Sequence, residues 1–278
     1  MLPVIMTKIT PREQSAESAR SAQSAAAPGW QAGGEAPLLC RFTAADLSGQ
    51  LDLSRPGQGV RLVAAEQPTE LLAVRLPTGC VEPADRWIRG ADAVAIHEPS
   101  DSRRLRITSL WRLQPGPAAC TLELVLSAQT AIVCSDGAVA VDCRLTAAAV
   151  SLGSSGETQT DWTAPATAAD GEQPISLPRQ RLPDTAVLCL LFHQAVGARS
   201  LAVLVRRDEG RQVMLWQRAA AGPKPPRFAL TTWFFPTLIE KGVLHRGRIQ
   251  AVLGPGKNDR DWAAAAASRL ARQPPLLQ

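Results

Sequence analysis

The stretch TLELVLSAQTAIV, residues 121–133, indicates the fold class. Leu122, Leu124 and Leu126 alternate with polar residues, so that Glu123 and Ser127 fall on the opposite face of an extended strand. A period of two is typical of an antiparallel strand that has one buried face and one partly exposed face. We therefore expect a mainly β protein.

Short apolar runs separated by turn residues continue on both sides of this stretch. A helix is expected at 260–272, because an alanine run there follows the candidate N-caps Asn258 and Asp259 and a Pro-Pro pair ends it. The sequence thus predicts an antiparallel β-sandwich with one C-terminal α-helix. The expected strands are 59–64, 71–76, 87–97, 104–113, 121–133, 138–148, 186–193, 200–206, 211–218, 228–235 and 243–253.

Composition divides the chain into segments. Residues 1–37 are rich in Ala and Ser and poor in bulky apolar side chains, so we expect a disordered tail there. Residues 151–181 are polar and rich in Gly, Ser, Thr and Pro, and we expect a flexible linker or loop between a first β half, 38–150, and a second, 182–278, that includes the helix. Residues 38–278 are expected to form one domain.

The two halves are either pseudo-repeats or unrelated β-meanders. Residues 93–130 contain a strand, a charged turn, a strand with a Trp near its end, a Pro-rich loop and a third strand. Residues 201–237 follow the same order. Short alternating segments carry little information, so the pattern alone leaves both interpretations open.

The bulk composition points to a globular protein without a targeting signal. Hydrophobic residues make up 45% of the 278 residues, Tyr is absent, and the net charge is +5. No apolar run is long enough for a membrane span or a secretion signal, so we expect a cytoplasmic protein with no membrane partner. None of the six Cys residues forms a C-x-x-C pair, and we expect them to be reduced and structural.

The first candidate site is the stretch from Trp87 to Asp92. In a single strand, Trp87 and Arg89 share one face and can form a stacking platform for a sugar or a base. Asp92 lies among apolar residues and needs a partner, either backbone N–H groups or an Arg. The simpler interpretation is structural: Trp87 packs at the edge of the core and Arg89 is solvated.

The second candidate site follows the expected turn at Glu240-Lys-Gly. Arg246 and Arg248 fall on one face of the next strand, where they can grip an anion or pair with acidic residues. His245 falls on the apolar face and is expected to be a packed, neutral histidine. The candidate ligand-binding residues are Trp87, Arg89, Asp92, Trp111, Arg112, Glu240, Arg246 and Arg248.

Two of these stretches carry a resemblance. The W-x-R-G-x-D-x-V-A pattern at 87–95 and the E-K-G-V-x-x-R-x-R pattern at 240–248 resemble motifs of an uncharacterised family of bacterial β-rich proteins. The resemblance runs from Trp87 to the C-terminal helix. It implies a β-rich fold and no known activity. His97 departs from it, since a Tyr is expected there.

The sequence leaves three classes of function open. It contains no G-x-S-x-G, Walker A, H-E-x-x-H or G-x-G-x-x-G motif, and we predict no cofactor and no metal site. The favoured hypothesis is a non-enzymatic module that binds a partner protein or a carbohydrate. The alternative, by fold-level analogy alone, is a carbohydrate-active enzyme on a β-supersandwich, with Glu240, His245 and Asp92 as acid/base candidates. A polyanion or nucleic-acid binder ranks last, because 25 acidic residues are interspersed with the 30 basic ones.

Overall fold

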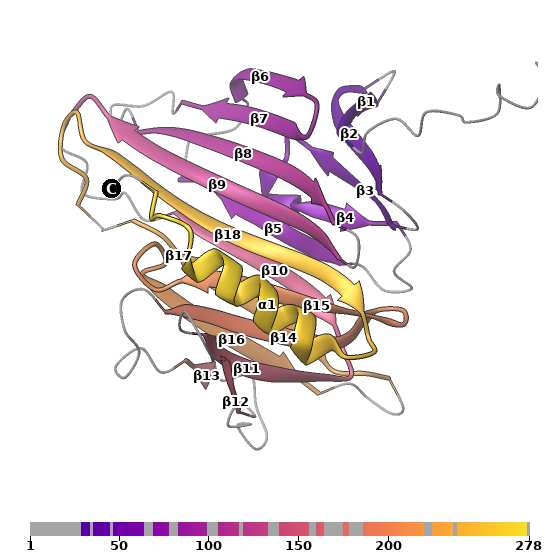
Figure 1. The fold of residues 1–278 in the computed structure, drawn as a ribbon. Helices are drawn as coiled ribbons and strands as arrows, with labels where there is room; N and C mark the ends of the chain where they lie inside the picture. Colours follow the sequence, from indigo (N-terminus) through magenta and orange to yellow (C-terminus); the bar gives the residue numbers. More distant parts are fainter. Residues whose placement is uncertain are drawn as a thin grey trace, which may run out of the picture.

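Two large antiparallel sheets face each other, and a helix lies across the outer face of one of them (Figure 1). The protein is described by a computed structural model. The antiparallel β-sandwich with a C-terminal helix is therefore confirmed. The described residues are 29–33, 36–44, 47–63, 69–77, 83–98, 105–116, 119–132, 139–155, 160–163, 175–177, 186–219, 224–235 and 238–276.

Among these residues each sheet contains nine strands. Sheet A has the order β1 (Gln31–Gly33), β2 (Ala36–Ala44), β3 (Leu47–Asp52), β4 (Val60–Leu62), β5 (Glu70–Arg75), β10 (Ala140–Thr146), β17 (Arg227–Trp233), β16 (Gln212–Arg218) and β13 (Ile175–Ser176). Sheet B has the order β12 (Thr160–Thr163), β11 (Ala149–Ser155), β14 (Val187–Val196), β15 (Arg199–Arg206), β18 (Leu244–Pro255), β9 (Cys120–Thr130), β8 (Leu105–Pro115), β7 (Asp92–His97) and β6 (Pro83–Arg89). A short 3-10 helix, Pro56–Gln58, connects β3 to β4.

The main core lies between the two sheets. Leu122, Leu124 and Leu126 of β9 are fully buried there, as their alternation predicts. Four of the cysteines, Cys40, Cys120, Cys143 and Cys189, are free and buried, as expected. Burial raises the pKa of the Cys143 thiol to about 12, so this residue behaves as a small hydrophobe. Cys80 and Cys134 lie outside the described residues.

A second core lies under α1 (Asp259–Ala271) on the outer face of sheet B. Ala263, Ala267 and Leu270 are buried against β14 and β15. These strands are hydrophobic on both faces because one face meets sheet A and the other meets the helix. The expected helix is confirmed, but Asn258 at its N-cap makes no side-chain capping bond in the described structure and has a left-handed φ of 54°.

The single strand expected at 87–97 is wrong, because this stretch is a hairpin. Strand β6 ends at Arg89, which pairs with Asp92 at the start of β7. Gly90 in the turn has a φ of 57°, which a residue without a Cβ adopts at little cost. Trp87 and Asp92 therefore lie on two different strands, and the faces expected for them in a single strand do not apply.

The expected segment boundaries also change. Trp30 is buried and β1 begins at residue 31, so a tail that reaches residue 37 is too long; residues 1–28 lie outside the described part. The segment 151–181 is not a loop throughout, because it contains the end of β11 and the strands β12 and β13.

Each half contributes a block of neighbouring strands to both sheets, and the two halves share one core. The pair β9–β18 joins the halves in sheet B, and the pair β10–β17 joins them in sheet A. The proposed repeat units also differ in arrangement. Strands β7, β8 and β9 are consecutive neighbours in sheet B, whereas β15 lies in sheet B and β16 and β17 lie in sheet A.

A buried indole connects the two sheets. The Nε1 of Trp111 in β8 donates a hydrogen bond of 3.2 Å to the carbonyl oxygen of Leu72 in β5. The Nε1 of Trp30 in turn donates one of 3.1 Å to the carbonyl oxygen of Trp111. Leu72 has a φ of 55° and lies in a β-bulge, where Leu71 and Leu72 together oppose Cys143. Trp111 thus holds a strained position of sheet A from the opposite sheet.

We expect Trp111→Phe to lower the free energy of unfolding by about 1–3 kcal/mol, because it leaves the buried Leu72 carbonyl without its donor and removes packed volume. Trp87→Phe is the matched control, since Trp87 is 44% exposed and should change stability by no more than about 0.5 kcal/mol. Urea unfolding followed by circular dichroism measures both. Equal effects of the two substitutions would contradict the role given to Trp111.

His97 predicts a loss of stability in acid. Its side chain is fully buried, and its two ring nitrogens have no hydrogen-bond partner in the described structure. Burial lowers the pKa of His97 from 6.5 to about 4. As the pH falls from 6.5 toward 4, the unfolded chain takes up a proton that the folded chain does not, so stability falls, by on the order of 3 kcal/mol. Urea unfolding at pH 7 and pH 4.5 should show this loss, and His97→Phe should make it smaller.

Candidate functional site

The candidate residues from the sequence do not converge on one surface. Trp87 and Arg89 are exposed on β6, the edge strand of sheet B. The partner that Asp92 requires is Arg112 of β8, whose Nε and Nη2 donate bonds of 2.7 and 2.9 Å to its two carboxylate oxygens. Hydrogen bonding to Asp92 raises the pKa of Arg112. This pair belongs to the outer face of sheet B.

Trp111 and Glu240 are also separated from this pair. Trp111 is fully buried between the sheets, so its selection as a ligand-binding residue is wrong. Glu240 is exposed in the turn before β18. His245 lies on the inner face of β18, opposite Ala128, whereas Asp92 belongs to the outer face of sheet B. The acid/base set of Glu240, His245 and Asp92 therefore does not form.

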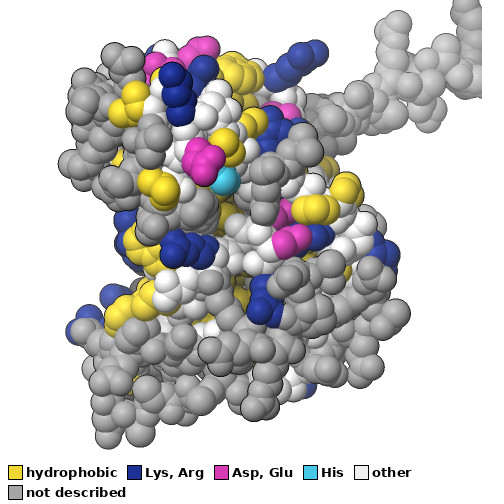
Figure 2. Space-filling view, turned by 90° about the vertical axis from the view of Figure 1, so that its left-hand side faces the viewer, with side chains coloured by type: hydrophobic (Ala, Val, Ile, Leu, Met, Phe, Trp, Pro, Cys, Tyr) yellow, Lys and Arg dark blue, Asp and Glu magenta, His cyan; other side chains and the backbone are white. Residues whose placement is uncertain are grey.

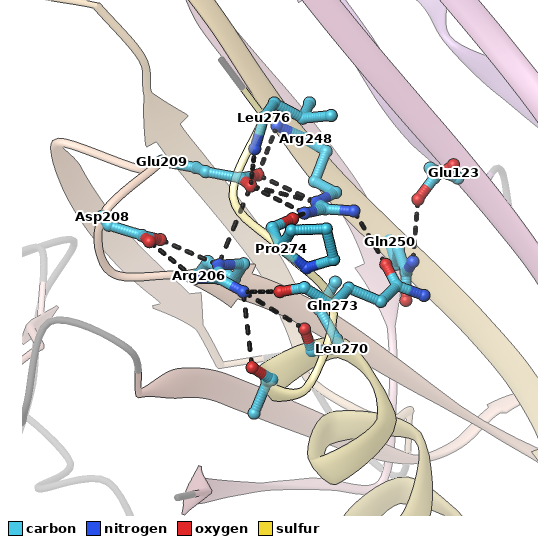
Figure 3. Close-up of polar contacts among 11 residues, drawn as sticks. Glu123, Arg206, Asp208, Glu209, Arg248, Gln250, Leu270, Gln273, Pro274 and Leu276 are labelled. Carbon is cyan, nitrogen blue, oxygen red and sulfur yellow. Dashed lines mark hydrogen bonds and ion pairs between the residues drawn. The ribbon is translucent and has the colours of Figure 1, made fainter. Parts of the chain in front are cut away.

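Arg248 is a structural residue, which corrects the second site (Figure 3). It is buried, and its Nε and Nη2 each lie 3.0 Å from Oε1 of Glu209. Its guanidinium also donates to Gln273, at 2.7 Å, and to the carbonyl oxygen of Pro274. An anion cannot reach a guanidinium whose donors are engaged in this way. Arg246, its neighbour on the same face, is half-buried.

Arg206 completes this buried cluster. Its Nε and Nη2 donate to the two carboxylate oxygens of Asp208 at 2.9 and 2.6 Å, which raises the pKa of Arg206 despite its burial. Its Nη1 donates to the carbonyl oxygens of Leu270, Ala271 and Gln273 at the C-terminal end of α1 (Figure 3). Free carbonyls at a helix end need such donors. The cluster therefore fixes the C-terminal segment to sheet B.

A second polar surface, which the sequence analysis did not identify, lies on the outer face of sheet A. Arg75 of β5 donates two bonds of 2.9 and 2.7 Å to Asp142 of β10. Thr231 of β17 donates a bond of 2.7 Å to the same carboxylate. Arg144 lies 2.9 Å from Glu70 and 3.6 Å from Asp142, so these side chains form a continuous network across three strands.

The bulge at Leu72 makes this network possible. Because Leu71 and Leu72 together oppose one residue of β10, both side chains enter the core. Glu70 pairs with Arg144 on one side of the bulge, and Arg75 pairs with Ala140 on the other. The extra residue lets both Glu70 and Arg75 face outward, whereas a regular strand would send them to opposite faces.

The same face contains a pocket of about 440 Å³. It is lined by Glu70, Arg144, Leu145, Thr146, Trp216, Gln217, Arg218, Arg227, Phe228 and Ala229. Sheet A lies behind sheet B in Figure 1, so its outer face forms the left-hand margin of Figure 2. That margin is hollowed, and hydrophobic and basic side chains gather in it. Farther along the same strands, the Arg75 guanidinium stacks over Trp233 with its central carbon 5.3 Å from the ring centroid.

The sequence pattern contains a weak signal for the polar outer face of sheet A. Asp142 and Arg144 alternate with buried residues on β10, and Met214 and Trp216 do the same on β16. What the pattern lacks is the pairing of β10 with both β5 and β17, which brings together residues up to 89 positions apart.

No family model matches the chain, and no curated protein matches it. Solved structures match the chain at low identity. A galactose mutarotase-like protein from Lactobacillus casei is 8% identical, with a TM-score of 0.43, over 77% of this chain and 99% of its own. A putative aldose 1-epimerase from Escherichia coli is 11% identical, with a TM-score of 0.41, over 77% and 98%. A TPR-domain containing protein from Parabacteroides distasonis is 8% identical, with a TM-score of 0.44, and the match covers 78% of this chain but only 47% of that protein.

The described part of the chain has no helix that is long and apolar enough to span a membrane.

We expect Glu209→Gln to lower the free energy of unfolding by about 3–5 kcal/mol, because it removes the negative charge that compensates the buried Arg248. The substitution keeps the shape of the side chain, so the loss reports charge rather than volume. Glu240→Gln, at an exposed turn, is the control and should leave the urea midpoint nearly unchanged. A midpoint for Glu209→Gln equal to that of the control would contradict the structural role of the cluster.

Proposed function

We propose that the protein binds an anionic carbohydrate in the pocket on the outer face of sheet A. The observation that carries this proposal is the combination of three Arg side chains and one Trp in a single pocket. Arg144, Arg218 and Arg227 outnumber the one acidic lining residue, Glu70. Arginine forms paired hydrogen bonds with planar carboxylates, so a uronic acid group is a suitable ligand.

Trp216 supplies the apolar surface that a sugar ring needs. It lies on the outer face of β16, directly opposite Ala229 of β17. The small Ala229 side chain leaves the space beside the indole open to a ligand. A pocket with one aromatic surface and a few convergent polar groups is the usual form of a small-molecule site.

The network around Asp142 supports a binding role. The Asp142 carboxylate accepts hydrogen bonds from Arg75 and Thr231, and Glu70 accepts one from Arg144. A general acid or base must exchange a proton with the bound ligand, and here both carboxylates already serve to orient Arg side chains. Glu70, the one acidic residue that lines the pocket, is thus engaged with Arg144, which favours a binding module over the alternative, a carbohydrate-active enzyme.

The proposal predicts selective binding of acidic oligosaccharides. In isothermal titration calorimetry, oligogalacturonate should bind more tightly than the neutral oligosaccharide maltohexaose, and added salt should weaken the binding. Trp216→Ala and Arg144→Gln should each reduce the affinity roughly tenfold or more, which is about 1.4 kcal/mol. Trp87→Ala and Arg89→Gln, on the exposed edge of sheet B, are the matched controls and should bind like the wild type.

Two outcomes would overturn this proposal. Equal affinity for neutral and acidic oligosaccharides would remove the role of the three Arg side chains. Tighter binding of a single-stranded DNA oligomer than of oligogalacturonate would favour the polyanion alternative instead.

A further inference from the structure

A serine, a histidine and an aspartate meet on the outer face of sheet B, where α1 begins. Ser151 belongs to β11, His193 to β14, and Asp259 is the first residue of α1. In the register of β11 and β14, Ala149 lies opposite His193, so Ser151 is its diagonal neighbour on the same face. The three residues are 42 and 66 positions apart, and no local motif marks them.

Their atoms are connected in the order that nucleophilic catalysis requires. The Oγ of Ser151 lies 2.8 Å from Nε2 of His193, and Nδ1 of His193 lies 2.6 Å from Oδ2 of Asp259. Because a carboxylate only accepts hydrogen bonds, Nδ1 carries a proton, and the tautomer that has its only proton there presents Nε2 to the Ser151 hydroxyl as an acceptor. This is the connection in which a histidine removes the proton of a serine nucleophile.

The aspartate is held in its charged form. Burial alone raises the pKa of Asp259, but hydrogen bonds from Ser200 and His193 outweigh this effect, and its pKa is lowered overall. The Ser200 hydroxyl donates to Oδ2 of Asp259 at 2.7 Å. A charged Asp259 fixes the orientation of the ring and stabilises the imidazolium that forms when His193 accepts a proton.

A cation lies on the other side of the serine. Nη2 of Arg260 is 3.4 Å from the Oγ of Ser151, and the guanidinium carbon is 5.9 Å from the centroid of the Trp162 ring. Arg260 is exposed, and 23% of the His193 side chain is exposed, so the cluster borders solvent. A guanidinium beside a nucleophile can stabilise the negative oxygen that develops when an acyl group is attacked.

We propose that Ser151, His193 and Asp259 form a catalytic triad that hydrolyses carboxylic esters. The Oγ of Ser151 attacks the ester carbonyl carbon, its proton passes to Nε2 of His193, and the carbonyl oxygen becomes an oxyanion beside Arg260. When the oxyanion collapses, the ester C–O bond breaks and the imidazolium returns its proton to the leaving alcohol. Water then attacks the acyl-serine with His193 as the base, releasing the acid and restoring Ser151. This activity is separate from carbohydrate binding on sheet A.

Covalent labelling of the full-length wild-type protein tests the proposal directly. The protein is incubated with a fluorophosphonate probe, which reacts with activated serines, and the adduct is located by peptide mass spectrometry. We expect one adduct, on Ser151, together with hydrolysis of p-nitrophenyl acetate. No adduct on the folded wild-type protein, or an adduct only at another serine, would overturn the triad and leave the cluster as an anchor for α1.

Variants separate catalysis from stability. Ser151→Ala and His193→Gln should each reduce ester hydrolysis at least about 100-fold, because members of a triad act as a unit. Ser155→Ala is the matched control: Ser155 lies on the same strand and its Oγ is 3.2 Å from that of Ser268, so this variant should keep the wild-type rate. Thermal unfolding of each variant monitors the fold. Equal rates for Ser151→Ala and the wild type would overturn the proposal, and if a variant does not fold, the adduct site in the wild type decides.

Discussion

The hydrogen bond from the Trp111 indole to the Leu72 carbonyl links the two sheets through their shared core. Leu72 lies in the bulge of β5 and has a left-handed backbone, and the hydrogen bond fixes this bulge from the opposite sheet. The bulge turns both Glu70 and Arg75 outward, next to Arg144 and Asp142. A contact in the core therefore arranges the charged network on the surface. The pocket depends in this way on buried residues that do not line it.

The C-terminal segment depends on a different kind of constraint. Arg206, Arg248 and Glu209 are buried, and Asp208 is partly exposed beside them. The remaining donors of the two Arg side chains bind the end of α1 and the chain that follows it (Figure 3). Burying a charge is costly unless every donor finds a partner, so the cluster specifies one path for this segment. The same helix brings Asp259 to His193 at its other end. Packing of α1 thus places charged groups at both ends of the second core.

Sequence reasoning succeeded where one local pattern determines the outcome. The alternation in β9 and the alanine run of α1 are local signals, and both elements form as expected. It failed at 87–97, where a strand-like sequence continues across a turn that depends on the positive φ of Gly90. It also chose Trp111 and Arg248 as ligand-binding residues because an aromatic or basic side chain looks the same in a sequence whether it is buried or exposed.

The sequence by itself determined that the chain is an antiparallel β protein with a C-terminal helix, because alternation with a period of two and a run of alanines are properties of consecutive residues. Only the tertiary structure decided which side chains meet. Asp142 and Thr231, or Ser151 and His193, come together through strand pairing between distant segments. Pairing of that kind is set by the core that the distant segments share, and no short stretch of the chain determines it.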